Sequence, residues 1–197
     1  MSQLSDDSHL AEHTLGQEKL LDGRFLKVVR DTVRLPDGTS ATREYIRHPG
    51  AVCIIGLTDD GQVVLERQWR HPVGRVMIEL PAGKIDAGES TLACAKRELL
   101  EETGYTAREW ARAGLLHPCI GYSDEFIEVW FARGLTEGER RLDAEEFLDV
   151  FLATPEALFG WCEDGTVTDG KTLSCMLWLH NVLSGRRVLD WQGESGA

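Results

Sequence analysis

GKIDAGESTLACAKRELLEETGY, residues 83–105, places acidic residues, one arginine and glycines at fixed spacings. Glu98, Glu101 and Glu102 stand at i, i+3 and i+4, so they share one face if the segment is helical. Like charges this close repel each other, and a cation is needed to hold them together. A hard divalent ion such as Mg²⁺ takes oxygen ligands and usually keeps waters and substrate phosphates in its shell. The segment therefore predicts a metal site that handles phosphate groups.

Glutamate runs on helices are more often solvated faces without a function. Two features favour the metal site here. Arg97 stands directly before Glu98 and four residues before Glu101, where we expect it to orient the acidic face as an ion-pair partner rather than to bind phosphate. Gly104 suits the left-handed residue that ends many helices. The spacing thus favours a built unit over a bare charged surface.

The segment resembles the Nudix box, G-x5-E-x7-R-E-U-x-E-E-x-G-U, in which U is a bulky apolar residue. The matching residues are Gly83, Glu89, Arg97, Glu98, Leu99, Glu101, Glu102, Gly104 and Tyr105. The resemblance implies an α/β fold, the Nudix α/β/α sandwich with a mixed sheet. It also implies hydrolysis of a nucleoside diphosphate linked to another group, X, with a divalent metal ion. It does not name X.

Hydrolysis of a pyrophosphate requires charge neutralisation, an oriented water and a base. We expect Glu98 and Glu102 to hold one or two metal ions, Mg²⁺ with Mn²⁺ as a possible substitute, which polarise phosphoryl oxygens and lower the pKa of bound water. Glu101 lies on the same face and can complete a ligand set directly or through water, and Glu89 in the preceding loop can add a further ligand. The family resemblance also implicates the carbonyl of Ala82.

Substrate contacts are expected just before the box, in LERQWR at 65–70. Arginine can hold a phosphate through two parallel hydrogen bonds. Nudix enzymes that act on nucleotide sugars carry a Q-[YF]-R element at this place, which favours Arg70 as a phosphate contact. Arg67 fits a surface salt bridge as well as a phosphate contact. Glu79 in IELPAG matches a glutamate that binds substrate or metal in the same enzymes.

Further segments resemble the ADP-ribose pyrophosphatase branch, over about residues 22–185. They are VRLPDG, REYIRHPGAV, LERQWR, IELPAGKIDAGE and HPCIGYSDEFIEVWFA. This resemblance implies hydrolysis of ADP-ribose to AMP and ribose 5-phosphate. The proline that marks the branch would fall at Ile120, so GDP-sugars, NADH and other dinucleotides stay open as substrates. A nucleotide-sugar binding module without turnover is a third hypothesis, although such modules generally lose box carboxylates and this box is complete.

The branch takes its general base from a loop after the box, here GLTEGERRLDAEEFLD at 134–149. Glu145 and Glu146 are the candidates, with Glu146 slightly favoured. Glu125 is the third candidate and also a candidate substrate contact. An exposed glutamate in such a loop commonly serves only to keep a surface hydrated, so this loop alone does not identify the base.

The resemblance also predicts the organisation of the chain. We expect a tail at 1–17, a small N-terminal β subdomain built on a hairpin at 18–47, and the Nudix hydrolase domain at 48–190. In this branch the N-terminal hairpin is exchanged between subunits, and the active sites form at the dimer interface. The chain is therefore expected to be a homodimer.

Apolar runs and turn residues predict the individual elements. Strands are expected at 24–34, 41–47, 51–57, 62–70, 76–80, 110–116, 125–133 and 146–152. Helices are expected at 91–103, with Ser90 as the N-cap, at 155–163 and at 170–184.

Composition narrows the class of protein. A net charge of -12 over 197 residues argues against nonspecific binding of nucleic acid or an anionic membrane. The five cysteines form no CxxC pair, which is typical of reduced thiols in a cytosolic protein. No run approaches the length of a membrane span, and the N-terminal residues lack a signal-peptide pattern. We therefore expect a cytoplasmic enzyme with a small nucleoside diphosphate substrate and no nucleic-acid or membrane partner.

Overall fold

The computed structural model describes residues 7–142 and 146–193. The chain divides into two compact units. One unit contains the residues up to His48 together with Cys119–Glu125, and the other contains Pro49–Pro118 and the chain from Phe126 onward. Among the described residues, no helix is long and apolar enough to cross a membrane.

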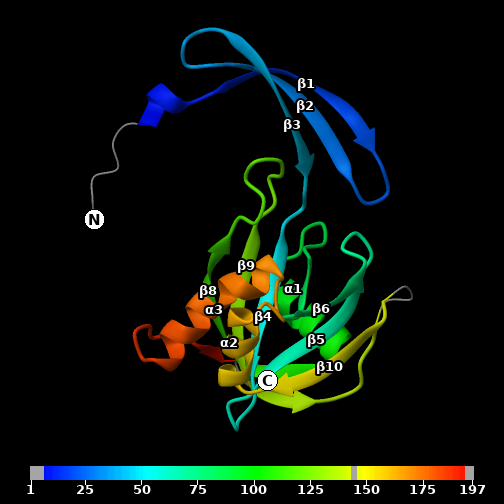
Figure 1. Ribbon diagram of the computed structural model, residues 1–197, viewed down its shortest axis with the longest axis vertical. Helices are drawn as coiled ribbons and strands as arrows, with labels where there is room; N and C mark the ends of the chain where they lie inside the picture. The colour runs from blue at the N-terminus through cyan, green and yellow to red at the C-terminus, as the bar shows by residue number, and fades with distance from the viewer. Residues whose placement is uncertain (1–6, 143–145, 194–197) are drawn as a thin grey trace. The chain divides into compact units, whose positions relative to one another are not determined.

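The N-terminal unit is a three-stranded antiparallel sheet in the order β1-β2-β3 (Figure 1). Its elements are the 3-10 helix η1 (Asp7–Leu10) and the strands β1 (His13–Asp22), β2 (Lys27–Arg34) and β3 (Ser40–Arg47). The turn between β2 and β3 is closed by the N–H of Gly38, which donates to the carbonyl of Leu35 over 2.9 Å. Gly38 has a φ of +85°, which glycine adopts without strain.

Two features of this unit differ from the sequence-based expectation. Residues 13–17 belong to β1, where we expected a tail. The sequence did not predict this part of the strand, because all ten residues of β1 are exposed and show no apolar alternation. The segment Cys119–Glu125 also joins this unit, although we placed it in the hydrolase domain. It is attached by the N–H of Ile46, which donates to the carbonyl of Tyr122.

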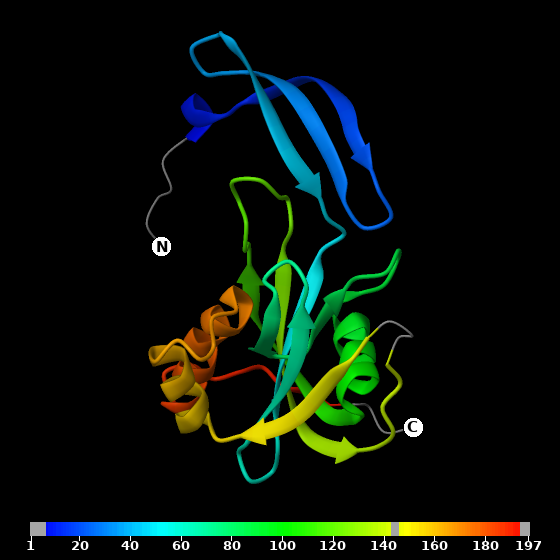
Figure 2. The ribbon, with the colours of Figure 1, turned by 45° about the vertical axis from the view of Figure 1, so that its right-hand side comes forward.

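The larger unit is built on an eight-stranded mixed sheet (Figures 1 and 2). Its strands are β4 (Ala51–Leu57), β5 (Val63–Arg70), β6 (Arg75–Glu79), β7 (Ala82–Lys84), β8 (Tyr105–Leu116), β9 (Ile127–Glu137), β10 (Leu148–Ala153) and β11 (Gln192–Gly193). The path is β10-β5-β4-β9-β8-β11, with β6 paired to β5 and β7 paired to β4. Only the β4–β9 pair is parallel among the described strands. The sheet extends past residue 190, where we expected the domain to end, because β11 pairs with β8.

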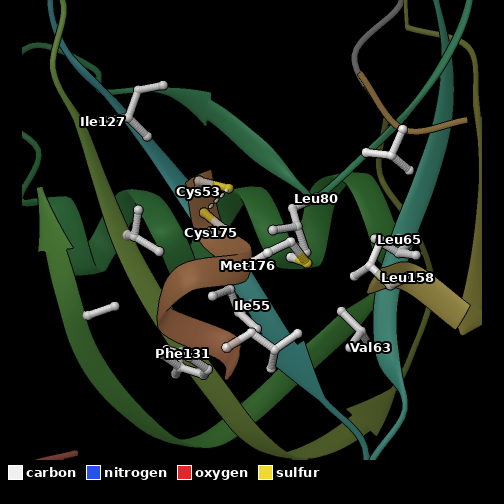
Figure 3. Close-up of a cluster of buried hydrophobic side chains, with 14 of the residues drawn as sticks. Cys53, Ile55, Val63, Leu65, Leu80, Ile127, Phe131, Leu158, Cys175 and Met176 are labelled. Carbon is white, nitrogen blue, oxygen red and sulfur yellow. Dashed lines mark hydrogen bonds between the residues drawn. The ribbon is translucent and has the colours of Figure 1, made fainter. Parts of the chain in front are cut away.

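Helices cover both faces of this sheet, as the alternation along β4 shows. The helices are α1 (Thr91–Glu98), continued by the π-helical turn η2 (Leu99–Thr103), α2 (Pro155–Glu163) and α3 (Gly170–Leu183). Val52 and Ile54 pack in one buried cluster with Leu99 of η2. Cys53, one residue along, packs on the other face with Cys175 of α3 (Figure 3). The predicted α/β/α sandwich is confirmed.

The sheet opens between β4 and β5. The two strands pair directly only at Leu57 and Val63, and further along each takes a different partner. The segment between β6 and β7 crosses this opening, where the carbonyl of Pro81 accepts a 2.9 Å hydrogen bond from the N–H of Ile54. Beside this opening, Glu66 of β5 and Glu79 of β6 are direct partners in the sheet.

Candidate active site

The start of the box is packed against the first glutamate of its helix. Glu98, the last residue of α1, lies so close to the backbone of Gly83 that a Cβ atom at Gly83 would overlap the carboxyl group. The glycine is therefore needed here for close approach. Burial is the main cause that raises the pKa of Glu98 to about 6, against the lowering effect of Arg97.

Glu102 lies in η2 and is almost fully buried. Its Oε2 atom accepts a 3.0 Å hydrogen bond from the backbone N–H of Ala82. Burial raises the pKa of Glu102 well above its usual range, and the negative charges of Glu66 and Glu98 raise it further. The structure therefore brings Ala82 and Glu102 together through the backbone N–H, and the role of the Ala82 carbonyl as a metal ligand stays a prediction.

The box helix is not α-helical throughout. We expected one α-helix from Thr91 to Thr103, but the segment from Leu99 becomes a π-helical turn. The hydroxyl of Thr103 donates to the carbonyl of Leu99, and Gly104 ends the turn with a φ of +79°. Since a π turn contains more residues than an α turn, it changes the relative direction of side chains on either side of it. Such turns occur often at functional sites.

Arg97 holds the rest of the acidic group in place. Its Nη1 atom donates to Glu98 over 2.7 Å and to Glu101 over 3.0 Å. Its Nε and Nη2 atoms donate to Glu89 over 3.0 and 2.8 Å, and this pairing lowers the pKa of Glu89 to about 2. Nη2 also donates to the carbonyl of Lys84. With its donors engaged by the box itself, Arg97 has the contacts of an orienting residue.

Arg70 and Glu79 form a second polar group. The Nε and Nη2 atoms of Arg70 donate to the two carboxylate oxygens of Glu79 over 2.7 and 2.8 Å. The Glu79 carboxylate is also paired with Lys171 of α3, which in turn contacts Asp169 over 3.0 Å. Glu79 is thus occupied by two cations, and it fixes the direction of the partly exposed Arg70 guanidinium.

Sequence reasoning missed Lys171 and Glu66. Lys171 opens a helix that we interpreted only through its apolar residues. Glu66 follows the buried run Val63–Leu65 on β5 and is itself fully buried. An acidic residue that directly extends an apolar strand was the available signal, because such a residue is rarely buried unless it is paired.

The acidic group fits a divalent cation. Its donors are carboxylate oxygens, which hard cations prefer, and Gly83 leaves the space that Glu98 occupies. Within the described parts of the chain, no three His, Cys, Asp or Glu side chains already form a metal-binding group. Instead, the carboxylates of Glu98 and Glu102 accept hydrogen bonds from protein donors, namely Arg97 and the backbone N–H of Ala82. Burial disfavours negative charge at both carboxylates, and a cation would offset that cost.

The loop that should supply the base is attached to the box. The N–H of Gly138 donates to the carbonyl of Gly104 over 2.8 Å, and the N–H of Arg141 donates to that of Glu101 over 3.1 Å. Glu146, half-buried just before β10, contributes to the raised pKa values of Glu98 and Glu102. The other candidate, Glu145, lies outside the described residues.

Two further candidate site residues, Arg67 and Glu125, belong to different units. Arg67 is exposed on β5, opposite Ile78 of β6 and Asp149 of β10. Glu125 belongs to the N-terminal unit, where its Oε1 atom lies 3.9 Å from Nδ1 of His48.

A cavity of about 410 Å³ opens beside the end of the box. Its lining includes Thr103, Tyr105, Glu137, Arg140 and Asp149, and none of the box carboxylates. Because none of the predicted site residues lines this cavity, the carboxylates at the sheet opening remain the better candidate for the reaction centre.

Comparison with known proteins agrees with this geometry. Residues 47–174 match the NUDIX domain model, and residues 12–46 match that of the nucleoside diphosphate sugar hydrolase N-terminal domain. Since the first match covers more than half of the chain, the chain belongs to the Nudix family and is a Nudix hydrolase.

Similar relatives carry more specific names. The chain is 36% identical over 172 residues to an ADP-ribose pyrophosphatase of Bacillus subtilis, covering 86% of this chain and 93% of the relative. It is 36% identical over 172 residues to a methanol dehydrogenase activator of Bacillus methanolicus, covering 85% and 92%. It is 42% identical over 147 residues to an ADP-ribose pyrophosphatase of Mycobacterium tuberculosis, covering 73% and 71%.

A solved structure confirms the fold. The crystal structure of an ADP compounds hydrolase superposes with a TM-score of 0.80, covering 89% of this chain and 95% of that one. At 22% identity this likeness concerns the fold alone.

Proposed function

We propose that this enzyme hydrolyses the pyrophosphate of ADP-ribose to AMP and ribose 5-phosphate, with Mg²⁺ or Mn²⁺ as its metal. The observation that carries the proposal is the complete box, whose carboxylates Glu98 and Glu102 lie at Gly83 and Ala82. The names of the B. subtilis and M. tuberculosis relatives support ADP-ribose as the substrate. The N-terminal match supports a nucleoside diphosphate sugar in general.

Glu98, Glu102 and the carbonyl of Ala82 would hold the metal, with Glu101 or Glu89 as further ligands if they leave Arg97. A bound divalent ion supplies charge neutralisation and lowers the pKa of its water. Arg97 keeps the box carboxylates in position, because its donors span three of them.

The remaining residues bind the substrate and move the proton. Arg70, held in one direction by Glu79, would donate to a phosphate of the substrate. Arg67 and Glu125 remain candidates for further substrate contacts. Water attacks phosphorus, the bond from that phosphorus to the bridging oxygen breaks, and Glu146 or Glu145 takes the proton of the water.

The proposal includes a cytoplasmic homodimer. Leu15, Leu20 and Leu21 of β1 are each at least 41% exposed, and a second copy could cover them. The five cysteines are free thiols, which agrees with a reducing compartment. Light scattering on the purified chain measures the assembly directly, and a monomer at micromolar concentration would contradict the dimer.

Other X groups compete with ADP-ribose because Ile120 replaces the proline that marks the branch. A phosphatase-coupled assay separates them, since alkaline phosphatase releases phosphate from AMP and ribose 5-phosphate but not from intact ADP-ribose. ADP-ribose, a GDP-sugar and NADH should be compared at equal concentration with Mg²⁺. The highest kcat/KM is expected for ADP-ribose. A ligand that raises the melting temperature without being consumed would instead favour a binding module.

A further inference from the structure

Glu66 is a buried carboxylate that no part of the reaction described above uses. Its exposed fraction is 0%. Neither Oε1 nor Oε2 has a hydrogen-bond partner among the described residues. An unpaired buried carboxylate is strongly disfavoured when it is charged. A fold that keeps one at this place therefore either binds it to something absent from the protein chain or tolerates a protonated acid.

The position of Glu66 favours the first alternative. Val64, two residues earlier on β5, is the nearest neighbour that a Cβ atom at Gly56 of β4 would meet. Side chains alternate along a strand, so Glu66 lies on the same face of β5 as Val64. On the neighbouring strand β6, its direct partner is Glu79, the last residue of that strand.

The pairing of β5 with β6 links Glu66 to the box. Glu66 lies directly opposite Glu79, and three residues further along the chain the backbone N–H of Ala82 donates to Glu102. Glu66 therefore lies on the sheet beside the segment that holds Glu102, whereas Glu98 and Glu102 belong to the α1–η2 helix. Glu98 is held by Arg97 and Glu102 by Ala82, whereas Glu66 is held by none of the described donors.

We propose that Glu66 is a further ligand group of the metal site, which binds the divalent cation from the β5 side together with Glu102. This proposal rests on the metal dependence of the proposed function and adds a residue outside the box to the ligand set. The cation removes the cost of the unpaired carboxylate and the repulsion between Glu66 and Glu102. Metal affinity of this chain therefore depends on a strand residue as well as on the helix.

The test measures metal binding without turnover. The full chain is stripped with EDTA and titrated with Mn²⁺, and free Mn²⁺ is followed by electron paramagnetic resonance. Glu66→Gln and Glu66→Val are compared with Glu156→Gln, which removes the same charge from the exposed first turn of α2. The Kd for Mn²⁺ is expected to rise roughly 10-fold or more in both Glu66 variants and less than about 2-fold in the control.

Melting temperatures provide the second readout. Metal-free Glu66→Val should melt at or above the temperature of the metal-free parent, because the unpaired carboxylate is gone, and Mn²⁺ should raise its melting temperature less. Unchanged Mn²⁺ affinity in both variants, with Mg²⁺-dependent hydrolysis intact in the parent, would overturn this inference alone. A parent chain that binds no Mn²⁺ would overturn the inference together with the metal dependence of the proposed function.

Discussion

The carboxylate of Glu98 occupies the space that a side chain at Gly83 would fill. The first glycine and the first helical glutamate of the box are therefore a contact pair, although they are fifteen positions apart in the sequence. This contact explains why a glycine opens the segment without a positive φ: the residue gives the carboxylate room beside the backbone.

Gly83→Ala should displace Glu98 and lower kcat by roughly 100-fold, the effect expected when a catalytic group moves by about 1 Å. The steady-state rate with ADP-ribose and Mg²⁺ measures this. Gly160→Ala is the matched control, since nothing lies near a Cβ atom at that helical position. Equal rates for the two variants would show that the close approach of Glu98 to Gly83 has no role in catalysis.

Arg97→Lys should lower kcat by roughly 10- to 100-fold and leave KM nearly unchanged. Lysine keeps the charge but cannot reach Glu89, Glu98 and Glu101 at once, as the guanidinium does. Steady-state kinetics separates the two roles considered for this residue. A large rise in KM at constant kcat would identify Arg97 as a phosphate ligand instead.

The metal-free protein should gain stability at neutral pH from Glu102→Gln. The pKa of Glu102 is raised in the folded state, so the folded chain holds a proton that the unfolded chain releases above about pH 4.5. Stability from this group is therefore complete below pH 4.5 and is lost as pH rises. The advantage of Glu102→Gln over the parent should grow by more than about 1 kcal/mol between pH 4.5 and about pH 7.

Urea unfolding in EDTA at several pH values measures this difference. Saturating Mn²⁺ should abolish the advantage of the variant, because only the parent then gains the full metal-binding energy. A difference in unfolding free energy that stays constant with pH would contradict the burial of an unneutralised carboxylate at this position.

Glu146→Gln should lower kcat by roughly 10²- to 10⁴-fold if Glu146 is the general base. Mn²⁺ affinity should stay close to that of the parent, since the amide removes a proton acceptor and leaves the box intact. Glu145→Gln is the paired comparison. A loss of kcat confined to Glu145→Gln would identify Glu145 as the base instead. Unchanged kcat in both variants would exclude this loop as the source of the base.

The α/β/α sandwich was expected from the resemblance to the Nudix family and is confirmed, and the orienting role of Arg97 stays a prediction. The spacing of the box was sufficient to predict that the residues from Thr91 onward form a helix. This was possible because the i, i+3, i+4 pattern is local, and because the Ser90 cap and the Gly104 end lie next to the residues they affect. The Ser90 hydroxyl accepts from the N–H of Ala93, as predicted for an N-cap.

Long-range features were not predictable in this way. Lys171 meets Glu79 across 92 positions of sequence, and only the packing of α3 against the sheet opening brings them together. The sequence marks Glu66 only as an acidic residue that extends an apolar strand, and its place beside the opening between β4 and β5 depends on how the sheet pairs. The π-helical turn after Glu98 is likewise not encoded in the spacing of the glutamates, because the same i, i+3, i+4 pattern fits a regular α-helix.

The rate of AMP formation from ADP-ribose in the parent and in Glu102→Gln tests the central claim most directly. We expect turnover to fall by several orders of magnitude at saturating Mg²⁺, with the melting temperature retained, because the variant loses a metal-binding carboxylate while its amide still accepts the hydrogen bond from Ala82. Near-normal turnover in Glu102→Gln would contradict the assignment of this carboxylate group as the reaction centre.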